Sequence, residues 1–271
     1  MSTATATPTA TPRPTTASRP FASVVHAFAL AKRSLIKTMR TPEALVDVTL
    51  QPIIFLLLFT VIFGQSVAGS RQEYLEFLLP GILAQTIGTA CIAIGVNLNQ
   101  DIEKGVFDRF RSMPIARSAP LVGAVSADVV RYVILAVVTL TTGFVMGFRI
   151  HTNPALALFG VCVAVAFALS LAWVSVWVGM KARTSGAVQG IMFLIVLPLS
   201  FASNVFVPID SLPGWMQGFV HVNPITQLVA TMRGCFIGGP IAWHLLWTVV
   251  WMVCLVVAFL PLALRAYRRR V

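Results

Sequence analysis

The sequence predicts an all-α integral membrane protein with six transmembrane helices. Of its 271 residues, 57% are hydrophobic and only 11% are charged, and the mean hydropathy is +0.85. Water-soluble domains are about 45–50% apolar and about 25% charged. Six segments reach the length of about 20 apolar residues that is needed to cross a hydrocarbon core about 30 Å thick. Lipid is therefore the expected solvent for most of the chain.

The first forty residues differ in character from the rest. Residues 1–20 are a tract of Thr, Ala and Pro without a continuous apolar core, which predicts a disordered cytoplasmic tail rather than a secretory signal peptide. In 21–40, apolar residues recur at helical spacing among several cations, and this pattern predicts a basic amphipathic helix in the membrane interface. An ordinary soluble helix is the alternative. The cations of this segment are Lys32, Arg33, Lys37 and Arg40.

The spans follow one another with short connections. Prolines inside them, such as Pro52, Pro80 and Pro198, are tolerated because neighbouring helices satisfy the freed backbone carbonyls. Together with the interfacial helix, the spans form one transmembrane domain over 21–265, and a basic cytoplasmic tail follows at 266–271. The six spans are expected near Ala44–Phe63, Leu75–Val96, Val122–Phe148, Ala155–Met180, Val188–Val207 and Leu245–Leu264.

The basic residues orient the chain. A net charge of +11, from 20 Lys and Arg against 9 Asp and Glu, suits a nucleic-acid-binding protein only where the cations cluster on a folded surface. Sixteen of the 20 instead fall in the N-terminal region, the 97–121 loop, the 181–187 loop and the C-terminal tail. The alternate loops hold only Arg71, Arg149 and Arg233. This bias predicts cytoplasmic termini, a multi-pass protein of the plasma membrane, and no nucleic-acid partner.

The sequence contains no familiar catalytic or metal-binding motif. It lacks a GxxxxGK[ST] phosphate loop, an HExxH pair, a nucleophile elbow and a CxxC pair. Its four Cys and four His are scattered without ligand spacing, so neither a metal site nor a disulfide framework is expected. The one carboxylate clearly within a span, Asp128, lies one turn before Arg131. Their i,i+3 spacing favours a structural ion pair over a functional site.

The cytoplasmic loop between the second and third spans carries both signs of charge. Residues 101–114 predict a short amphipathic helix that stops at Pro114, with apolar residues on one face and charged residues on another. Mixed charge suits docking to a protein better than docking to anionic lipid, which favours cations alone. A solvated connector without a partner fits the same pattern equally well.

A second unusual segment separates the fifth and sixth spans. Residues 208–240 are amphipathic and are interrupted by several Pro and Gly residues. This composition predicts short re-entrant helices that dip into the outer leaflet.

Several short motifs follow one another along the chain. They are Gln51-Pro52, Glu103-Lys104-Gly105, Arg109-Phe110-Arg111, Met113-Pro114, Arg117, Leu212-Pro213-Gly214-Trp215, Asn223-Pro224 and Arg233-Gly234. In this order, over about residues 21–265, the chain resembles the ABC-2 type permeases, in particular the daunorubicin and doxorubicin resistance membrane subunits of actinobacteria. The family's loop often reads Gly-Thr-Leu-Glu, whereas residues 105–108 here are Gly, Val, Phe and Asp.

The resemblance implies the membrane subunit of an ATP-driven exporter. Two such subunits would pair, as a homodimer or with a second permease, above separate ATP-binding cassette subunits. This chain would bind no cofactor, because ATP and Mg²⁺ would belong to the partner. The 21–40 helix matches the family's connecting helix, and the loop over 100–114 matches its coupling helix. The coupling residues would be Asp101, Glu103, Lys104, Gly105, Phe107, Asp108, Arg109 and Arg111.

The resemblance also implies that the first, second and fifth spans face the dimer axis and line a substrate path. A path for a hydrophobic, ring-bearing or lipid-like solute is mostly apolar with few polar contacts. Packing between helices is the alternative role for hydroxyls and amides within spans, where such bonds average about 0.6 kcal/mol. The matching polar or aromatic positions are Gln51, Gln85, Thr86, Thr89, Phe201, Ser203 and Asn204.

The expected function is export of an amphiphilic drug, antibiotic or lipid by a subunit that is not itself an enzyme. An ABC-2 exporter of polysaccharide or another lipid-linked polymer is the alternative within transport. An ion-coupled secondary transporter predicts inverted repeats and buried unpaired carboxylates near mid-membrane, and the sequence shows neither. A membrane anchor that recruits a cytoplasmic protein is a third class.

Overall fold

The computed structural model describes residues 42–105 and 119–270, and within these ranges the chain is helical with short connections. This confirms the all-α membrane class. The expected tail at 1–20 and interfacial helix at 21–40 lie outside the described residues. The helices are α2 (Pro42–Ala68), α3 (Arg71–Ala90), α4 (Ile92–Glu103), α6 (Ala119–Val145), α7 (Pro154–Lys181), α8 (Ser185–Phe201), η1 (Ile209–Ser211), α9 (Gly214–Val222), α10 (Pro224–Ile237) and α11 (Ala242–Arg270).

Five helical stretches of the described chain are long and apolar enough to cross a membrane. They lie in α2, in α3 with α4, in α6, in α7 and in α11. The fifth expected span is instead the short helix α8, whose 17 residues end at Phe201 rather than near Val207. At about 1.5 Å per residue, α8 is about 26 Å long, slightly less than the hydrocarbon core. The structure thus supplies five spans of full length, not six, because the helical part of this segment stops early.

The second span is longer than expected and is broken once. Cys91 separates α3 from α4, and the apolar stretch continues to Glu103 rather than ending at Val96. The break is not a proline effect, because Pro80 lies within α3 eleven positions earlier. Directly after the break, Ile92 O accepts a hydrogen bond from the Ser175 hydroxyl of α7 at 3.2 Å.

Side-chain caps define where four helices begin. Ser70, Asn153, Thr184 and Asn223 accept a backbone N–H at the starts of α3, α7, α8 and α10, respectively. These bonds satisfy amides that the first turn of a helix otherwise leaves unpaired.

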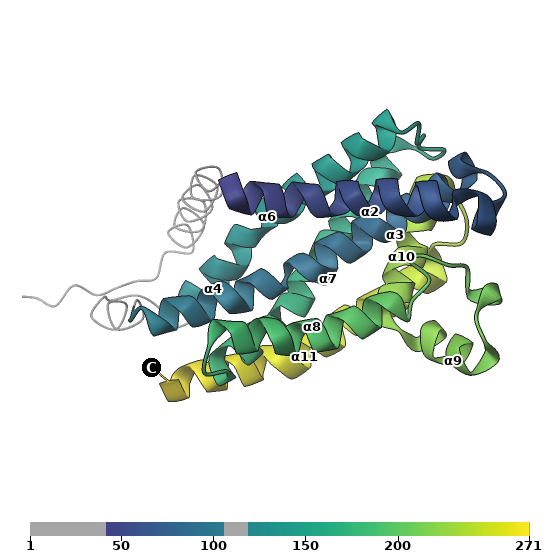
Figure 1. Cartoon of the computed structure of the whole chain (residues 1–271). Coiled ribbons are helices and arrows are strands. Elements are labelled where there is room, and N and C mark those ends of the chain that lie inside the picture. Colours follow the sequence, from purple (N-terminus) through teal and green to yellow (C-terminus); the bar gives the residue numbers. More distant parts are fainter. Residues whose placement is uncertain (1–41, 106–118, 271) are drawn as a thin grey trace, which may run out of the picture.

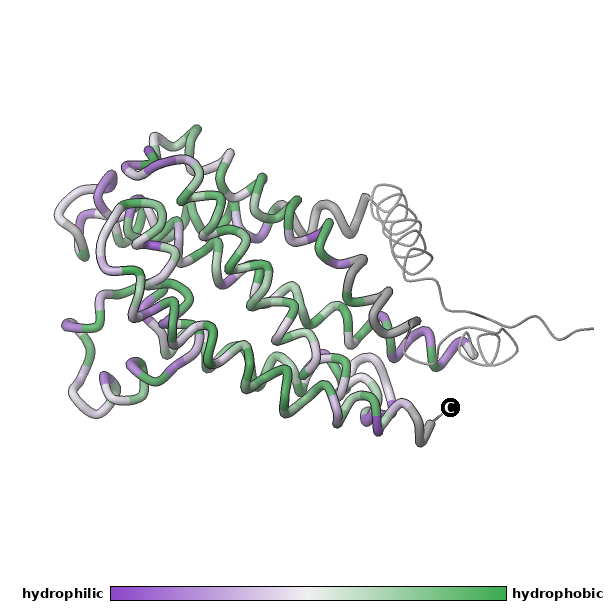
Figure 2. Tube along the Cα trace, turned by 180° about the vertical axis from the view of Figure 1, so that it is seen from behind, coloured by the Kyte–Doolittle hydropathy of each residue, from purple (hydrophilic) through white to green (hydrophobic). Residues whose placement is uncertain are grey.

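The helices α3 and α7 form the centre of the bundle. α3 packs against α2, α6 and α10, whereas α7 packs against α4, α10 and α11. The long helices run side by side (Figure 1), with the end of α4 and the C-terminus at one end of the bundle and α9 at the other. Hydrophobic residues dominate the middle of the helices, and hydrophilic residues gather near the two ends (Figure 2). This distribution is that of a bundle embedded in lipid.

Candidate functional site

The expected coupling loop is described only where it leaves α4. Asp101 and Glu103 belong to the last turn of α4, Lys104 is its C-cap, and Gly105 follows with a φ of 66°. A positive φ favours glycine and turns the chain out of the helix. The helix expected over 101–114 therefore does not start at Asp101, because these residues finish α4. Phe107, Asp108, Arg109 and Arg111 lie outside the described residues.

Buried polar contacts join α4 to α7 just before this loop. Asn99 Nδ2 donates to Gly179 O at 2.8 Å and to Ala182 O at 3.1 Å. One turn earlier, the Gly95 N–H donates to Ser175 Oγ at 3.1 Å, and the Ser175 hydroxyl donates back to a carbonyl of α4. The α4–α7 seam is defined here as Gly95, Asn99, Ser175 and Gly179.

Glycine lets the two backbones of this seam touch. A Cβ added to Gly95 would lie 2.4 Å from Ser175 O, and one added to Gly179 would lie 2.6 Å from Gly95 O. These distances are shorter than a carbon and an oxygen can approach without bonding, and the obstacle is backbone, which cannot rotate away. The seam therefore fixes how α4 sits along α7.

The expected path residues of the first and second spans lie on α2 and α3. Thr86 Oγ1 donates to Ile82 O at 2.6 Å, and Thr89 Oγ1 donates to Thr86 O at 3.0 Å. Both hydroxyls thus bond to the backbone of their own helix. Gln85 is half-buried on the same helix, whereas Gln51 is exposed on α2.

Phe201 belongs to a stack of aromatic rings that joins α2 to the end of α8. Its ring centroid lies 5.2 Å from that of Phe206, which lies 4.6 Å from that of Phe59. Phe59 in turn stacks with Phe55 and Phe63 along α2. Phe63 and Phe201, at two ends of the stack, are exposed by 40% and 50%. The surface expected to face a substrate path is aromatic at this point.

The non-helical residues 202–207 after α8 are held by Arg233 of α10. Its Nε donates to Phe77 O at 3.0 Å, and Nη2 donates to Asn204 O at 2.6 Å and to Val205 O at 3.2 Å. The guanidinium carbon also lies 3.5 Å from the centre of the Phe77 ring. Three backbone carbonyls and one aromatic ring therefore surround the guanidinium.

Tyr74 of α3 and Asn223, the N-cap of α10, hold the same end of α8. The Tyr74 hydroxyl donates to Phe206 O at 2.9 Å. Asn223 Nδ2 donates to Leu199 O at 2.8 Å and to Ala202 O at 2.7 Å, while its Oδ1 caps α10. Carbonyls within the hydrocarbon region must find partners inside the protein. The outer clamp, defined as Tyr74, Phe77, Asn223 and Arg233, allows α8 to stop early without leaving these groups unpaired.

Two further expected path residues, Ser203 and Asn204, lie inside this clamped segment. They are only 3% and 6% exposed. The Ser203 hydroxyl donates to Ser200 O at 2.5 Å, and the Asn204 carbonyl accepts from Arg233. These residues therefore shape the end of α8 from within and do not present their side chains at an open surface.

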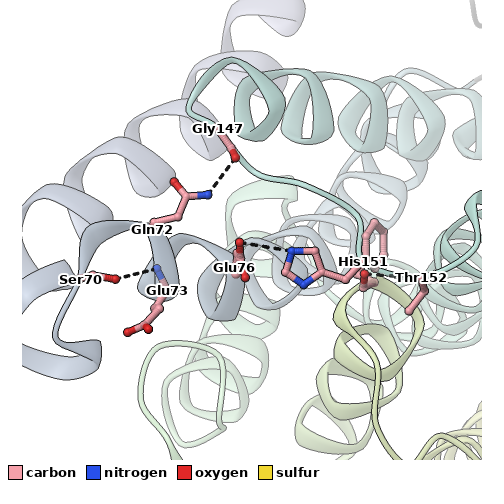
Figure 3. A network of polar contacts seen from close by, with 8 residues as sticks. Ser70, Gln72, Glu73, Glu76, Gly147, His151 and Thr152 are labelled. Carbon is pink, nitrogen blue, oxygen red and sulfur yellow. Dashed lines mark hydrogen bonds and ion pairs between the residues drawn. The ribbon is translucent and has the colours of Figure 1, made fainter.

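The loop between α6 and α7 is tied to α3 and α10 close to the clamp. Gln72 Nε2 donates to Gly147 O at 2.8 Å, and His151 Nε2 lies 3.5 Å from Glu76 Oε1 (Figure 3). The Thr152 hydroxyl donates to a carbonyl near the end of α10. This network and the clamp together join α3, α7 and α10 at the end of the bundle that carries α9.

The two charged residues of α6 meet as their spacing predicts. Asp128 Oδ2 lies 3.7 Å from Arg131 Nη1, and Asp128 is 7% exposed. The two charges can offset each other within one helix turn.

Neither Tyr74 nor Asn99 nor Ser175 is singled out by sequence reasoning. Asn223 appears there only as part of a motif, and Arg233 only as part of a motif and as a cation of an outer loop. The only feature of the sequence that could have indicated these residues is a polar side chain inside an apolar run. It could not identify partners, because the Asn99 contacts join residues 80 and 83 positions apart.

The architecture defines the class as a multi-pass helical membrane protein. A family model described as "ABC-2 type transporter" matches residues 26–237, and the chain belongs to that family.

Relatives of named function support this membership. The chain is 35% identical to the daunorubicin resistance ABC transporter permease DrrB1 of Streptomyces coeruleorubidus, over 95% of this chain and 90% of the relative. It is 26% identical to the probable doxorubicin resistance permease DrrC of Mycobacterium tuberculosis, over 97% and 94% of the two chains. It is also 26% identical to the inner membrane transport permease YadH of Escherichia coli, over 71% and 77%. The chain is thus a permease-type protein of the plasma membrane.

Proposed function

We propose that this chain is the permease half of an ABC exporter that moves a hydrophobic or amphiphilic compound out of the cell. The observation that carries the proposal is the similarity over nearly the whole chain to permeases whose names record daunorubicin and doxorubicin resistance. ATP hydrolysis takes place on a separate cassette subunit, because the chain has no phosphate-loop motif. Two permease subunits pair, either as a homodimer or with a second permease.

In this proposal the coupling loop and the aromatic stack between α2 and α8 have different roles. The loop that begins at Lys104 meets the ATPase, and its mixed charge is complementary to a protein surface. The exposed rings of Phe63 and Phe201 supply an apolar wall of the path for the compound. Both functions require the opposite ends of the bundle to move together.

Transport provides the direct test. In inside-out vesicles containing the chain and its cassette ATPase subunit, addition of ATP is expected to drive accumulation of doxorubicin. The accumulation is measured by the quenching of doxorubicin fluorescence. Vesicles with the ATPase alone are expected to show no accumulation. Equal accumulation with and without the permease would contradict the proposal, as would ATP hydrolysis by the purified permease alone.

In this proposal α8 with residues 202–207 completes a sixth crossing, and both termini are cytoplasmic. A cysteine placed at exposed Asp210 is expected to react with a membrane-impermeant maleimide in intact cells. A cysteine at exposed Arg183 is expected to react only after the membrane is opened. The reverse pattern would overturn the orientation. Labelling of both sites in intact cells would show that α8 does not cross the membrane.

A further inference from the structure

We propose that Asn99 is a positioning residue that makes α4 and the α7–α8 turn move as one unit when the coupling loop is displaced. This inference rests on the proposed export function and adds a route by which the ATPase stroke reaches the substrate path. It assigns a role to the α4–α7 seam, which no motif in the sequence marks.

Asn99 acts as a C-cap supplied by another helix. The last carbonyls of a helix lack partners within that helix. Here the Asn99 side-chain amide satisfies Gly179 O in the last turn of α7 and Ala182 O just beyond it. Asn99 is 1% exposed, so water cannot replace the two bonds. The position at which α7 ends is thereby tied to α4.

The glycines one turn away prevent the two helices from sliding past each other. The backbones of Gly95 and Gly179 are in direct contact, and Ser175 both accepts from and donates to the α4 backbone. Helices packed through small residues with interlocked backbones change register only by separating first. A displacement of α4 is therefore passed to the end of α7.

The chain continues from both sides of the seam to functional segments. Five residues after Asn99, Lys104 caps α4 and begins the coupling loop. Three residues after Lys181, Thr184 caps α8 by accepting the Ala187 N–H at 3.2 Å. α8 also packs against α4 and ends at Phe201 in the aromatic stack. A movement of the coupling loop thus reaches α8 both through a turn of only three residues after α7 and through the direct packing of α8 on α4.

One atom of Asn99 indicates that the seam is not purely structural. Its Oδ1 is buried and has no hydrogen-bond partner among the described residues. An unsatisfied buried acceptor costs about 1–3 kcal/mol, and a site selected for stability alone would satisfy both ends of the amide. A second arrangement of the seam, in which Oδ1 accepts a hydrogen bond, would recover this cost.

The first experiment compares Asn99→Ala with Asn97→Ala in proteoliposomes that contain the permease and its cassette ATPase. Asn97 lies on the same helix two positions away but is exposed, so its variant is the matched control. Asn99→Ala is expected to keep ATP hydrolysis within about twofold while lowering doxorubicin transported per ATP about tenfold. Asn97→Ala is expected to leave both unchanged. An unchanged ratio in Asn99→Ala would overturn the inference.

The second experiment keeps Asn99 in place, so it does not depend on whether Asn99→Ala folds. Spin labels at exposed Lys104 and Arg183, in a background with exposed Cys162 and Cys254 replaced by alanine, report the distance across the seam. That distance is expected to stay constant when ATP and vanadate are added. The distance from Lys104 to a label at exposed Arg149 is expected to change.

The outcomes separate the inference from the proposed function. A change in the Lys104–Arg183 distance would overturn movement as one unit while leaving ATP-driven export intact. No response of either distance, together with no ATP-dependent transport, would overturn both.

Discussion

Replacing Arg233 with leucine is expected to destabilise the permease by ~3–5 kcal/mol, because three buried carbonyls would lose a charged donor at once. In the folded protein the guanidinium bonds to the carbonyls of Phe77, Asn204 and Val205. Leucine fills similar space but donates no hydrogen bond. The measurement is thermal unfolding in detergent. A thiol-reactive dye monitors unfolding by reacting with Cys91 and Cys235, which are fully buried in the folded protein.

Two comparisons make the Arg233 result specific. Arg233→Lys keeps the charge but loses the planar fork, so it is expected to recover only part of the stability. Arg149→Leu removes a cation from an exposed position and is expected to change stability by no more than about 0.5 kcal/mol. Equal melting of the Arg233→Leu and Arg149→Leu proteins would show that the clamp does not hold the end of α8.

Gly95→Ala is expected to destabilise the permease by ~3 kcal/mol or more and to abolish transport. The added methyl carbon would lie 2.4 Å from both Ser175 O and Ser175 Oγ. Overpacking of a core commonly costs about 1–3 kcal/mol. The cost here lies at or above the top of that range, because the helices can relieve the clash only by moving apart and breaking the Asn99 bonds. Yield of folded protein after size-exclusion chromatography and its melting temperature are the measurements.

Gly88→Ala is the matched control for that substitution. Gly88 is also a buried helical glycine of the second span, but a Cβ added there meets no atom within 4 Å. Because alanine is favoured over glycine in a helix by about 0.5–1 kcal/mol, this variant is expected to be as stable as the parent or slightly more so. Similar losses of stability in Gly88→Ala and Gly95→Ala would show that the seam has no special role.

The general class follows from sequence because it depends on composition and on runs of residues. Apolar segments of about 20 residues predict spanning helices wherever they occur. The helices α2, α7 and α11 cover the expected positions, and α6 covers all but the last three residues of the third span. The exception is instructive. Val188–Val207 is predominantly apolar, so hydropathy predicts a helix over all of it, yet the helix stops at Phe201. Side chains of α3 and of α10 with its N-cap compensate the unpaired carbonyls, and no local pattern contains that information.

The candidate site was predictable only in part, for a similar reason. The motif residues Asn223 and Arg233 point to the correct region, but their partners come from α3 and from the end of α8. Ser203 and Asn204 were expected to line a path from their polarity and their span. The structure buries both side chains. Polarity by itself does not indicate whether a side chain faces a path or closes a helix end.

The sequence by itself determined the solvent of this protein, its helical class and its family, because these depend on hydrophobicity, charge distribution and local motifs. Tertiary structure alone decided where α8 ends and how α4 is joined to α7. Each of these features depends on contacts such as that between Asn99 and Gly179, 80 residues apart. Such contacts form only when the relative rotation and height of two helices are fixed. That relation is set by the packing of the whole bundle and leaves no periodic pattern in either helix.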